Sequence, residues 1–270
     1  MNRYAISLAG LIITGSFLLA ANAPANAAPI AYDGFDYATG SPITGQTGGT
    51  GWVGAWTGDN DLVATPGLGF DTLSTIGGYV DSDNNFNGVF RTLAQQNTAN
   101  GDLWGSFLVA SGDSGNTNGF MGLSLLQDGG EQIIFGKLFN GSAFYNFGVL
   151  AGANNGASAT GTAQITGAAS LFVFQFDNTG SGLNINAWIN PTPGTLTPDT
   201  TAFSVTNVAD ISFNRIRFDN GGGASYDYDE VRFGTTFADV SPAAAVVPEA
   251  GTLALLLPVI VGFVARRTRK

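Results

Sequence analysis

The sequence predicts an all-β fold, a two-sheet antiparallel β-sandwich, from three observations. Short runs rich in Val, Ile, Phe and Tyr recur along the chain, and clusters of Gly, Asn, Asp and Ser separate them, which is typical of a sandwich. No sustained helical period is present, and residues 91–96 (RTLAQQ) are expected to form at most one or two helical turns. Of the 20 Phe residues, all but Phe17 and Phe263 lie between the two apolar ends of the chain, so core side chains are plentiful.

Eight runs are the expected strands. They cover residues 103–110, 119–126, 131–139, 144–150, 170–177, 183–190, 211–219 and 226–234. Residues 177–182 (DNTGSG) contain the Gly and Asn that a tight hairpin needs for positive φ angles. Residues 183–190 (LNINAWIN) alternate between two faces. One face meets a core (Leu183, Ile185, Ala187 and Ile189), and the other meets solvent (Asn184, Asn186, Trp188 and Asn190).

Two segments are too small or too polar to build a core. Residues 151–168 are expected to form a long mobile loop or an edge strand. Residues 235–246, after Gly234, are expected to be a linker, because Pro and repeated small residues bury little surface. The folded domain is therefore expected to cover residues 28–234.

The N-terminal residues predict export. Arg3 precedes an apolar stretch from Ala5 to Ala21, and small-residue cleavage patterns follow at 21–23 and 25–27, which is the plan of a secretory signal peptide. We expect residues 1–27 to be removed, because cleavage after Ala23 would put Pro24 first in the mature chain. The alternative is a permanent N-terminal anchor.

Composition excludes some classes of function. Residues 29–247 carry 19 acidic and five basic residues, a net charge of −14, which repels nucleic acid and anionic lipid. We therefore expect no nucleic-acid partner. Cys is absent, so burial must stabilise the domain without disulfides, and the absence of His removes the commonest metal ligand and acid–base group.

The C-terminal 25 residues have the order of a short membrane segment. Sixteen residues, 250–265, separate Glu249 from Arg266, and at ~1.5 Å per helical residue they span about 24 Å, against a hydrocarbon core of about 30 Å. The basic end consists of Arg266, Arg267, Arg269 and Lys270. The positive-inside bias would keep this end cytoplasmic and leave the domain outside.

This arrangement resembles the PEP-CTERM sorting signal of Gram-negative surface proteins. The motif would be Val247, Pro248 and Glu249, with Ala250 where the family usually has a second proline. The resemblance implies that an exosortase, a membrane-embedded transpeptidase, recognises the Pro-Glu element and removes the tail after a transient association with the inner membrane. A marginal helix length suits such a temporary anchor, and the alternative is an ordinary tail anchor.

The domain itself resembles the LamG-like jelly-roll domains that often precede PEP-CTERM tails. The resemblance rests on an ordered set of short pieces, among them AYDGFDYATG, GGTGWVGAW, EQIIFGK, AWINPTPG and DYDEVRFGTTFADV, within residues 30–240. It implies the concanavalin A-like lectin/glucanase fold. In that fold the first and last strands are neighbours in one sheet, so YDGFDY and DEVRFG are expected to lie together.

An enzyme is the less favoured hypothesis. Without His or Cys the chain has no Ser–His–Asp or Cys–His arrangement. A glycosidase needs two carboxyl groups at the scissile bond. The resemblance implies a Glu-x-Asp-x-x-Glu strand for a glucanase of this fold, and this chain has no such strand. Glu131 and Glu230 are the glutamates of residues 28–234, and Glu131 is expected to stabilise the turn before its strand. A pair of Asp residues stays open as an alternative.

Metal binding is not predicted, although Ca²⁺ stays open. Residues 81–88 (DSDNNFNG) start like an EF-hand loop, but Phe86 and Thr92 stand where that loop requires Gly and Glu. The other oxygen clusters are residues 59–61 (DND) and 227–230 (DYDE), with Asp227 and Asp229 the first candidates for Ca²⁺. We expect these residues mainly to form turns.

The sugar-binding candidates are Trp and Asn residues. Trp56 and Trp188 lie among polar residues and are expected to offer flat apolar faces to sugar rings, while Asn184 and Asn186 bind hydroxyl groups. Trp104, within LWGSF, is expected to be buried. The sequence thus predicts an exported, non-catalytic cell-surface or matrix protein associated with exopolysaccharide. The alternatives are a carbohydrate-active enzyme of the same fold and a self-associating structural subunit.

Overall fold

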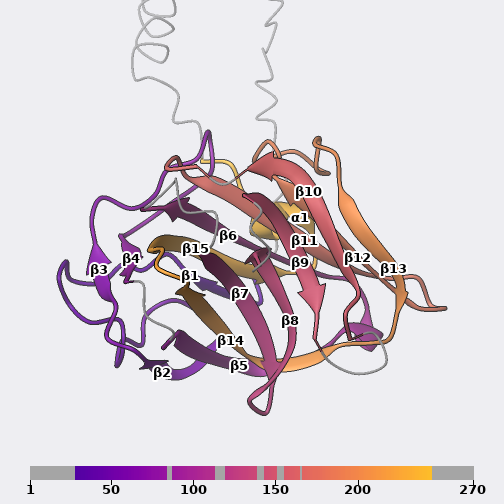
Figure 1. The fold of residues 1–270 in the computed structure, drawn as a ribbon, viewed down its shortest axis with the longest axis horizontal. Coiled ribbons are helices and arrows are strands. Elements are labelled where there is room, and N and C mark those ends of the chain that lie inside the picture. Colours follow the sequence, from indigo (N-terminus) through magenta and orange to yellow (C-terminus); the bar gives the residue numbers. More distant parts are fainter. Residues whose placement is uncertain are drawn as a thin grey trace, which may run out of the picture.

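The protein forms two antiparallel β-sheets packed face to face (Figure 1). The structure is a computed structural model, and it describes residues 28–83, 87–112, 119–138, 143–150, 155–164 and 166–244. The predicted all-β sandwich is confirmed. The signal peptide, the sorting motif and the membrane segment predicted from the sequence lie outside the described residues.

Sheet A has eight strands. Its order is β13 (Phe203–Val208), β12 (Leu183–Ile189), β11 (Ser170–Asn178), β6 (Leu103–Ser111), β15 (Tyr226–Gly234), β4 (Tyr79–Ser82) and β3 (Leu62–Ala64), and β1 (Ala31–Asp33) also pairs with β15. The pairing of β1 with β15 places Ala31 opposite Phe233. The expectation that YDGFDY and DEVRFG lie together is therefore confirmed.

Sheet B has seven strands. Its order is β10 (Ser158–Gln164), β9 (Phe144–Val149), β8 (Gly130–Lys137), β7 (Phe120–Gln127), β14 (Ser212–Gly221), β5 (Val89–Asn97) and β2 (Trp52–Gly58). A 3₁₀ turn, η1 (Thr98–Asn100), follows β5, and a single-turn helix, α1 (Phe237–Val240), follows β15.

All eight predicted strands are present, and two other segments also form strands. Residues 91–96 belong to β5 and extend along β14, because pairing with that strand overrides a weak helical preference. Within 151–168, residues 158–164 form β10 at the edge of sheet B, which was one of the two expected outcomes.

Aromatic rings fill the space between the sheets. Phe135 of β8 stacks on Phe174 of β11 with centroids 4.0 Å apart, so the two rings join sheet B to sheet A. The inward set of β12 is buried as predicted, at 0% exposure for Leu183, Ile185 and Ala187. This continuous core is what stabilises a domain without disulfides.

The predicted linker is wrong for residues 235–244, which fold onto the outer face of sheet A. Thr236 caps α1 in a capping box with Asp239, and Phe237 and Val240 are buried. The physical reason is an apolar surface that the sequence pattern hides: Trp104 lies on that outer face, and Phe237 packs against its ring at 5.8 Å. The segment beyond α1 is fixed by hydrogen bonds to residues of two loops, such as Ala244 N to Thr72 O at 2.7 Å.

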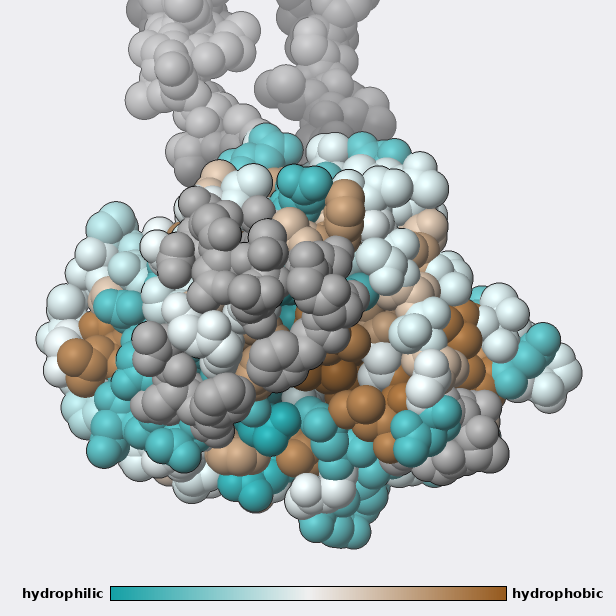
Figure 2. Space-filling model, viewed as in Figure 1, coloured by the Kyte–Doolittle hydropathy of each residue, from teal (hydrophilic) through white to brown (hydrophobic). Residues whose placement is uncertain are grey.

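Exposed apolar side chains are few and dispersed. Figure 2 shows apolar residues in several separate areas of one face, between polar residues. The large apolar side chains that are exposed among the described residues are Val53, Leu62, Ile76, Leu150 and Leu196. Single exposed apolar residues are normal on proteins and indicate no site by themselves. None of the helices in the described part of the chain has the length and apolar character that crossing a membrane requires.

A buried ion pair joins the first strand to sheet B. Asp33 and Arg91, each 1% exposed in its side chain, lie 3.5 Å apart between Oδ2 and Nη1. Asp33 also accepts hydrogen bonds from the Tyr37 hydroxyl (2.7 Å), Trp56 Nε1 (2.8 Å) and the backbone N–H of Phe35 (2.9 Å). A buried carboxylate is tolerated when it is paired and hydrogen-bonded in this way.

Arg91 is held through both terminal nitrogens of its guanidinium. Its Nη1 and Nη2 donate to the carbonyl oxygens of Gln46 (3.1 Å) and Gly48 (2.9 Å), and its guanidinium lies over the rings of Trp52 and Trp56. The pair therefore fixes residues 33–56 against β5.

Replacing Arg91 with Met is expected to lower the free energy of unfolding by about 3–5 kcal/mol, because it leaves the Asp33 carboxylate buried without its counter-charge. Urea unfolding followed by circular dichroism measures the change. Arg215→Met is the control, since Arg215 is half-buried and stacks on Phe90, a contact worth about 1 kcal/mol or less. Equal losses in the two variants would contradict the central role of the ion pair.

Candidate functional site

Trp56 is not available to a ligand, contrary to the sequence-based prediction. Its ring is 0% exposed, stacks on Phe218 and donates its indole N–H to Asp33. The polar neighbours that suggested an exposed ring, such as Asp59 and Asn60, belong to the loop after the strand. The Trp56 side chain is part of the core and of the hydrogen-bond network around Asp33.

Trp188 lies on the predicted face, but other residues cover it. It stands on the outer face of sheet A, where its ring stacks on that of Trp104 at 5.4 Å and an interplanar angle of 15°. Phe237 of α1 packs on Trp104, and Trp188 is 9% exposed. The prediction of a sugar-stacking surface is therefore wrong for Trp188, because residues 237–240 make this end of the face a small second core. Trp104 is buried, as expected.

Asn184 and Asn186 do lie on the outer face, within a ladder of polar side chains. Asn186 Nδ2 donates to Gln175 Oε1 on β11 at 3.3 Å, and its Oδ1 accepts from the Ser204 hydroxyl on β13 at 2.7 Å. Gln175 in turn donates to Asp102 Oδ2 at 3.4 Å, next to β6. One row of hydrogen-bonded side chains therefore crosses three neighbouring strands, β13, β12 and β11, and ends at the residue before β6.

A second row runs beside the first. Asn184 Nδ2 donates to Asp177 Oδ2 at 3.3 Å, and Asn184 Oδ1 accepts from the backbone N–H of Asn207 at 3.4 Å. The β11–β12 register sets the two rows side by side, because it places Gln175 opposite Asn186 and Asp177 opposite Asn184. We call the two rows the amide ladder: Asp102, Gln175, Asp177, Asn184, Asn186 and Ser204.

An open cleft of about 670 Å³ lies at the end of the amide ladder. It is lined by the β11–β12 turn, η1 and the segment after β13, through Ala99, Asn178, Gly180, Ser181, Gly182, Asn207, Val208, Ala209 and Asp210. Asn178 shapes the turn, because its Oδ1 accepts from Gly180 N (2.8 Å) and its Nδ2 donates to Thr98 O (2.8 Å). Gly180 has φ 75°, the left-handed conformation that favours glycine. The sequence predicts this hairpin but not the cleft, because the cleft also needs residues 207–210 beside the turn.

The first candidates for Ca²⁺ do not form a metal site together. Asp229 is 0% exposed, and its two oxygens accept from the backbone N–H groups of Leu68 (2.8 Å) and Glu230 (2.7 Å). Burial, together with the charge of Glu230, raises the pKa of Asp229 to about 9. Asp227 is half-buried beside Asp81, and burial followed by that like charge raises its pKa to about 6. Asp229 therefore fixes a loop over the sheet and cannot reach a dissolved ion.

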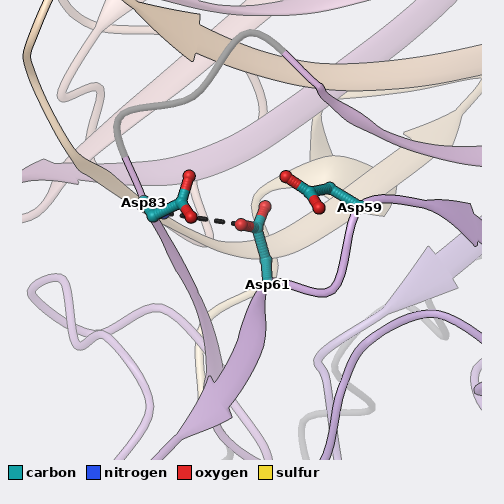
Figure 3. A group of neighbouring side chains, drawn as sticks. All are labelled: Asp59, Asp61 and Asp83. Carbon is teal, nitrogen blue, oxygen red and sulfur yellow. Dashed lines mark hydrogen bonds between the residues drawn. The ribbon is translucent and has the colours of Figure 1, made fainter.

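The structure instead brings together acidic residues from two other clusters of the sequence. Asp59, Asp61 and Asp83 each offer a carboxylate oxygen within 4.8 Å of the others (Figure 3). The β3–β4 register places Leu62 opposite Asp81, so the residues just outside these strands meet. The backbone N–H of Asp83 donates to Asp61 Oδ1 at 3.4 Å. Residues 59–61 and 81–88 are separate clusters in the sequence, and only the strand register brings them together.

This acidic cluster has the chemistry of a divalent-cation site. Burial raises the pKa of Asp61 to about 6, and the nearby charges of Asp83 and Asp59 act in the same direction. Asp59 Oδ2 is buried without a hydrogen-bond partner among the described residues. Carboxylate oxygens are the ligands that Ca²⁺ prefers, and a bound cation would offset their repulsion.

The prediction that Glu131 stabilises the turn before β8 is wrong. Glu131 instead forms an ion pair with Arg217 of β14. Arg217 Nη2 lies 2.7 Å from Glu131 Oε1 and 3.2 Å from Asp219 Oδ2 on sheet B. Burial raises the pKa of Asp219, and the charge of Arg217 opposes that effect. The guanidinium occupies the space between the two carboxylates, where a glycosidase would need its scissile bond. Glu230 is buried and paired with Arg232.

Sequence comparisons assign no family: no family model matches, and a search of curated proteins finds no similar sequence. Among solved structures the chain is similar to the carbohydrate recognition domain of Emp47p, with a TM-score of 0.44, 12% identity, and coverage of 74% of this chain and 96% of that one. It is similar to an endo-1,3-beta-glucanase from Streptomyces sioyaensis, with a TM-score of 0.48, 12% identity, and coverage of 76% and 95%. It is also similar to the binding domain of botulinum neurotoxin serotype D, with a TM-score of 0.47, 10% identity, and coverage of 76% and 50%. Both a recognition domain and an enzyme are among these structures, so the similarity does not separate binding from catalysis.

Millimolar Ca²⁺ is expected to raise the melting temperature by more than NaCl of the same ionic strength, because an ion held by Asp59, Asp61 and Asp83 binds the native state alone. Such linkage is worth about 2.7 kcal/mol when the ion is at a hundredfold excess over Kd. The increment should shrink as the pH falls below about 6, where Asp61 takes up a proton that competes with the ion. Differential scanning calorimetry measures both effects.

Asp61→Asn is expected to abolish the Ca²⁺ increment, and Asp36→Asn, a change at an exposed position away from the cluster, is expected to keep it. Equal shifts from Ca²⁺ and matched NaCl in the unaltered protein would show that the cluster holds no ion.

Proposed function

We propose that this chain is an exported, non-catalytic cell-surface or matrix protein that binds polysaccharide through the amide ladder. The observation that carries the proposal is the ladder itself. Its side chains come from adjacent strands and hold one another by hydrogen bonds, so their positions are set before a ligand arrives. Such preorganisation lowers the entropic cost of binding.

The chemistry of the ladder suits sugar hydroxyl groups. Each hydroxyl donates one hydrogen bond and accepts others, and the ladder offers amide donors together with amide and carboxylate acceptors. Asn184, Asn186, Gln175 and Asp177 are half-buried, while Asp102 and Ser204 are exposed, so a ligand can reach them. The seven residues of β12 extend for about 23 Å at ~3.3 Å per residue, which favours an extended ligand over a small one.

The position of the ladder also agrees with anchoring by a C-terminal tail. The last described residues are fixed near the Trp188 end of β12, since Gly194 N donates to Ser241 O at 2.7 Å. The cleft lies at the opposite end of the same strand, beside Ser181 and Gly182. The two ends of the described chain also leave the sandwich on one side (Figure 1). A tail held at a membrane would therefore leave the cleft facing outward.

The state of the carboxylates supports binding over catalysis. Glu131 and Asp219 share one guanidinium, and Asp229 and Glu230 are buried and hydrogen-bonded. A glycosidase needs one carboxyl group to donate a proton to the leaving oxygen and a second to attack or to activate water, and both must reach the sugar. These four residues are occupied in other contacts.

Replacing both Asn184 and Asn186 with Ala is expected to weaken polysaccharide binding by about tenfold or more, because several hydrogen bonds worth about 1 kcal/mol each are lost. Affinity electrophoresis of the purified full chain in gels that contain soluble polysaccharides measures the retention. Asn214→Ala is the matched control, since Asn214 lies on sheet B and bonds to Asp128.

Equal retention of the ladder variant and the control would contradict the site. Release of new reducing ends from a retained polysaccharide would support the enzyme hypothesis instead. Oligomers without any retention would support the structural subunit.

The proposed route to the surface has its own test. The sequence features that support it are the export signal of residues 1–27 and the resemblance of Val247, Pro248 and Glu249 to an exosortase motif. Intact-mass measurement of protein released from the native host is expected to give a chain that starts near Ala28 and stops close to that motif. A chain that still carries VARRTRK would contradict sorting and leave a simple tail anchor.

A further inference from the structure

The basic residues of the domain all lie away from the amide ladder. Arg91, Lys137 and Arg232 are buried, at 2%, 0% and 3% exposure. Arg215 and Arg217 belong to β14 of sheet B. Among the residues that the structure describes, the ladder and its cleft therefore contain no cationic side chain.

Carboxylates, in contrast, occur along the whole site. Asp102 and Asp177 belong to the ladder, and Asp210 lines the cleft. Their hydrogen-bond donors are neutral: Asp102 accepts from Asn178 N at 3.0 Å and from Gln175 Nε2, and Asp177 accepts from Asn184 Nδ2. Within the described part of the chain, none of the three carboxylates is in an ion pair.

This distribution of charge has a consequence for the ligand. A polysaccharide with uronate, sulfate or phosphate groups would bring negative charge against three carboxylates with no cation to receive it. A protonated amino group would meet an acceptor of opposite charge at Asp102, Asp177 or Asp210. The cleft of about 670 Å³ is lined by Asp210 together with Asn178 and Asn207, so a sugar bound there would lie beside a carboxylate.

We propose that the amide ladder and its cleft select polysaccharides that carry protonated amino groups, with Asp102, Asp177 and Asp210 as the residues that set this preference. The proposal rests on the polysaccharide-binding function proposed above and names its ligand class. The amides and hydroxyls provide the contacts that all sugars share, and the three carboxylates add the discrimination.

Three oligosaccharides of equal length test the preference: a glucosamine oligomer, its N-acetylated counterpart, which is neutral, and a uronate oligomer. Isothermal titration calorimetry with the purified full chain at pH 6 and low salt is expected to give about tenfold tighter binding of the amine than of the neutral oligomer, and no detectable binding of the uronate. Added NaCl should reduce the preference, because exposed charges are screened at ~10 Å in 0.1 M salt.

Two variants with the same change in net charge locate the effect. Asp102→Asn combined with Asp177→Asn and Asp210→Asn is expected to lose the tenfold preference, so that the ratio of amine to neutral affinity falls to about one. A far-UV circular dichroism spectrum and a urea unfolding midpoint equal to those of the unaltered protein show that this variant is folded. The control variant replaces Asp36, Asp71 and Asp128, which are exposed away from the ladder, with Asn and should keep the tenfold preference.

The outcomes separate the two proposals. If the neutral or the uronate oligomer binds as tightly as the amine, or if the control variant loses the preference equally, the proposed selectivity is wrong while polysaccharide binding stands. If no oligomer binds, the proposed function itself fails.

Discussion

The buried carboxylate of Asp33 is the interaction on which the N-terminal part of the domain depends. It pairs with Arg91 of β5. Because β1 pairs with β15 in sheet A and β5 belongs to sheet B, this ion pair connects the two sheets. Three further donors converge on it, from Phe35, Tyr37 and Trp56. In a domain without cysteine, this network does for residues 31–58 what a disulfide does elsewhere, because it fixes distant segments of chain in one arrangement. The Asp33 carboxylate and the two terminal nitrogens of Arg91 can be buried because each has hydrogen-bond partners.

The outer face of sheet A shows how one strand can serve two purposes. On β12, Trp188 stacks on Trp104 beneath α1, and the same alternation presents Asn186 and Asn184 further toward the start of the strand. The segment that follows β15 packs on the apolar end through Phe237, which contacts Trp104. The amide end has no such cover among the described residues, and it meets the cleft at the β11–β12 turn. The apolar end and the amide end of β12 lie on the same strand and face, so the difference between them comes from their side chains.

Local patterns in the sequence predicted the sheets well, because strand alternation and turn residues act over a few positions. The alternation in residues 183–190 assigned each side chain to the correct face, and the eight richest apolar runs are all strands. The burial of outer-face side chains by distant segments of the chain could not be predicted in the same way. Trp188 was expected to meet solvent because its neighbours in sequence are amides. Its ring instead stacks on Trp104, which Phe237 contacts in turn, and both residues are far away in the chain.

The same limit applies to the candidate site. Asp61 and Asp83 meet only through the β3–β4 register, and the partners of Asn186 come from β11 and β13. Strand β5 also escaped prediction from composition, because its polar residues are held by pairing with β14 and β2. The residue types at the site could be named from the sequence, but their grouping required strand order and register.

Backbone amide chemical shifts, measured by NMR during titration with a soluble glucosamine oligomer, test the location of the site most directly. The account predicts that the perturbed amides cluster on residues 175–186 and 204–210, along the ladder and around the cleft. Perturbations that cluster instead on the outer face of sheet B, around Gly122, Asn146 and Arg217, would contradict it.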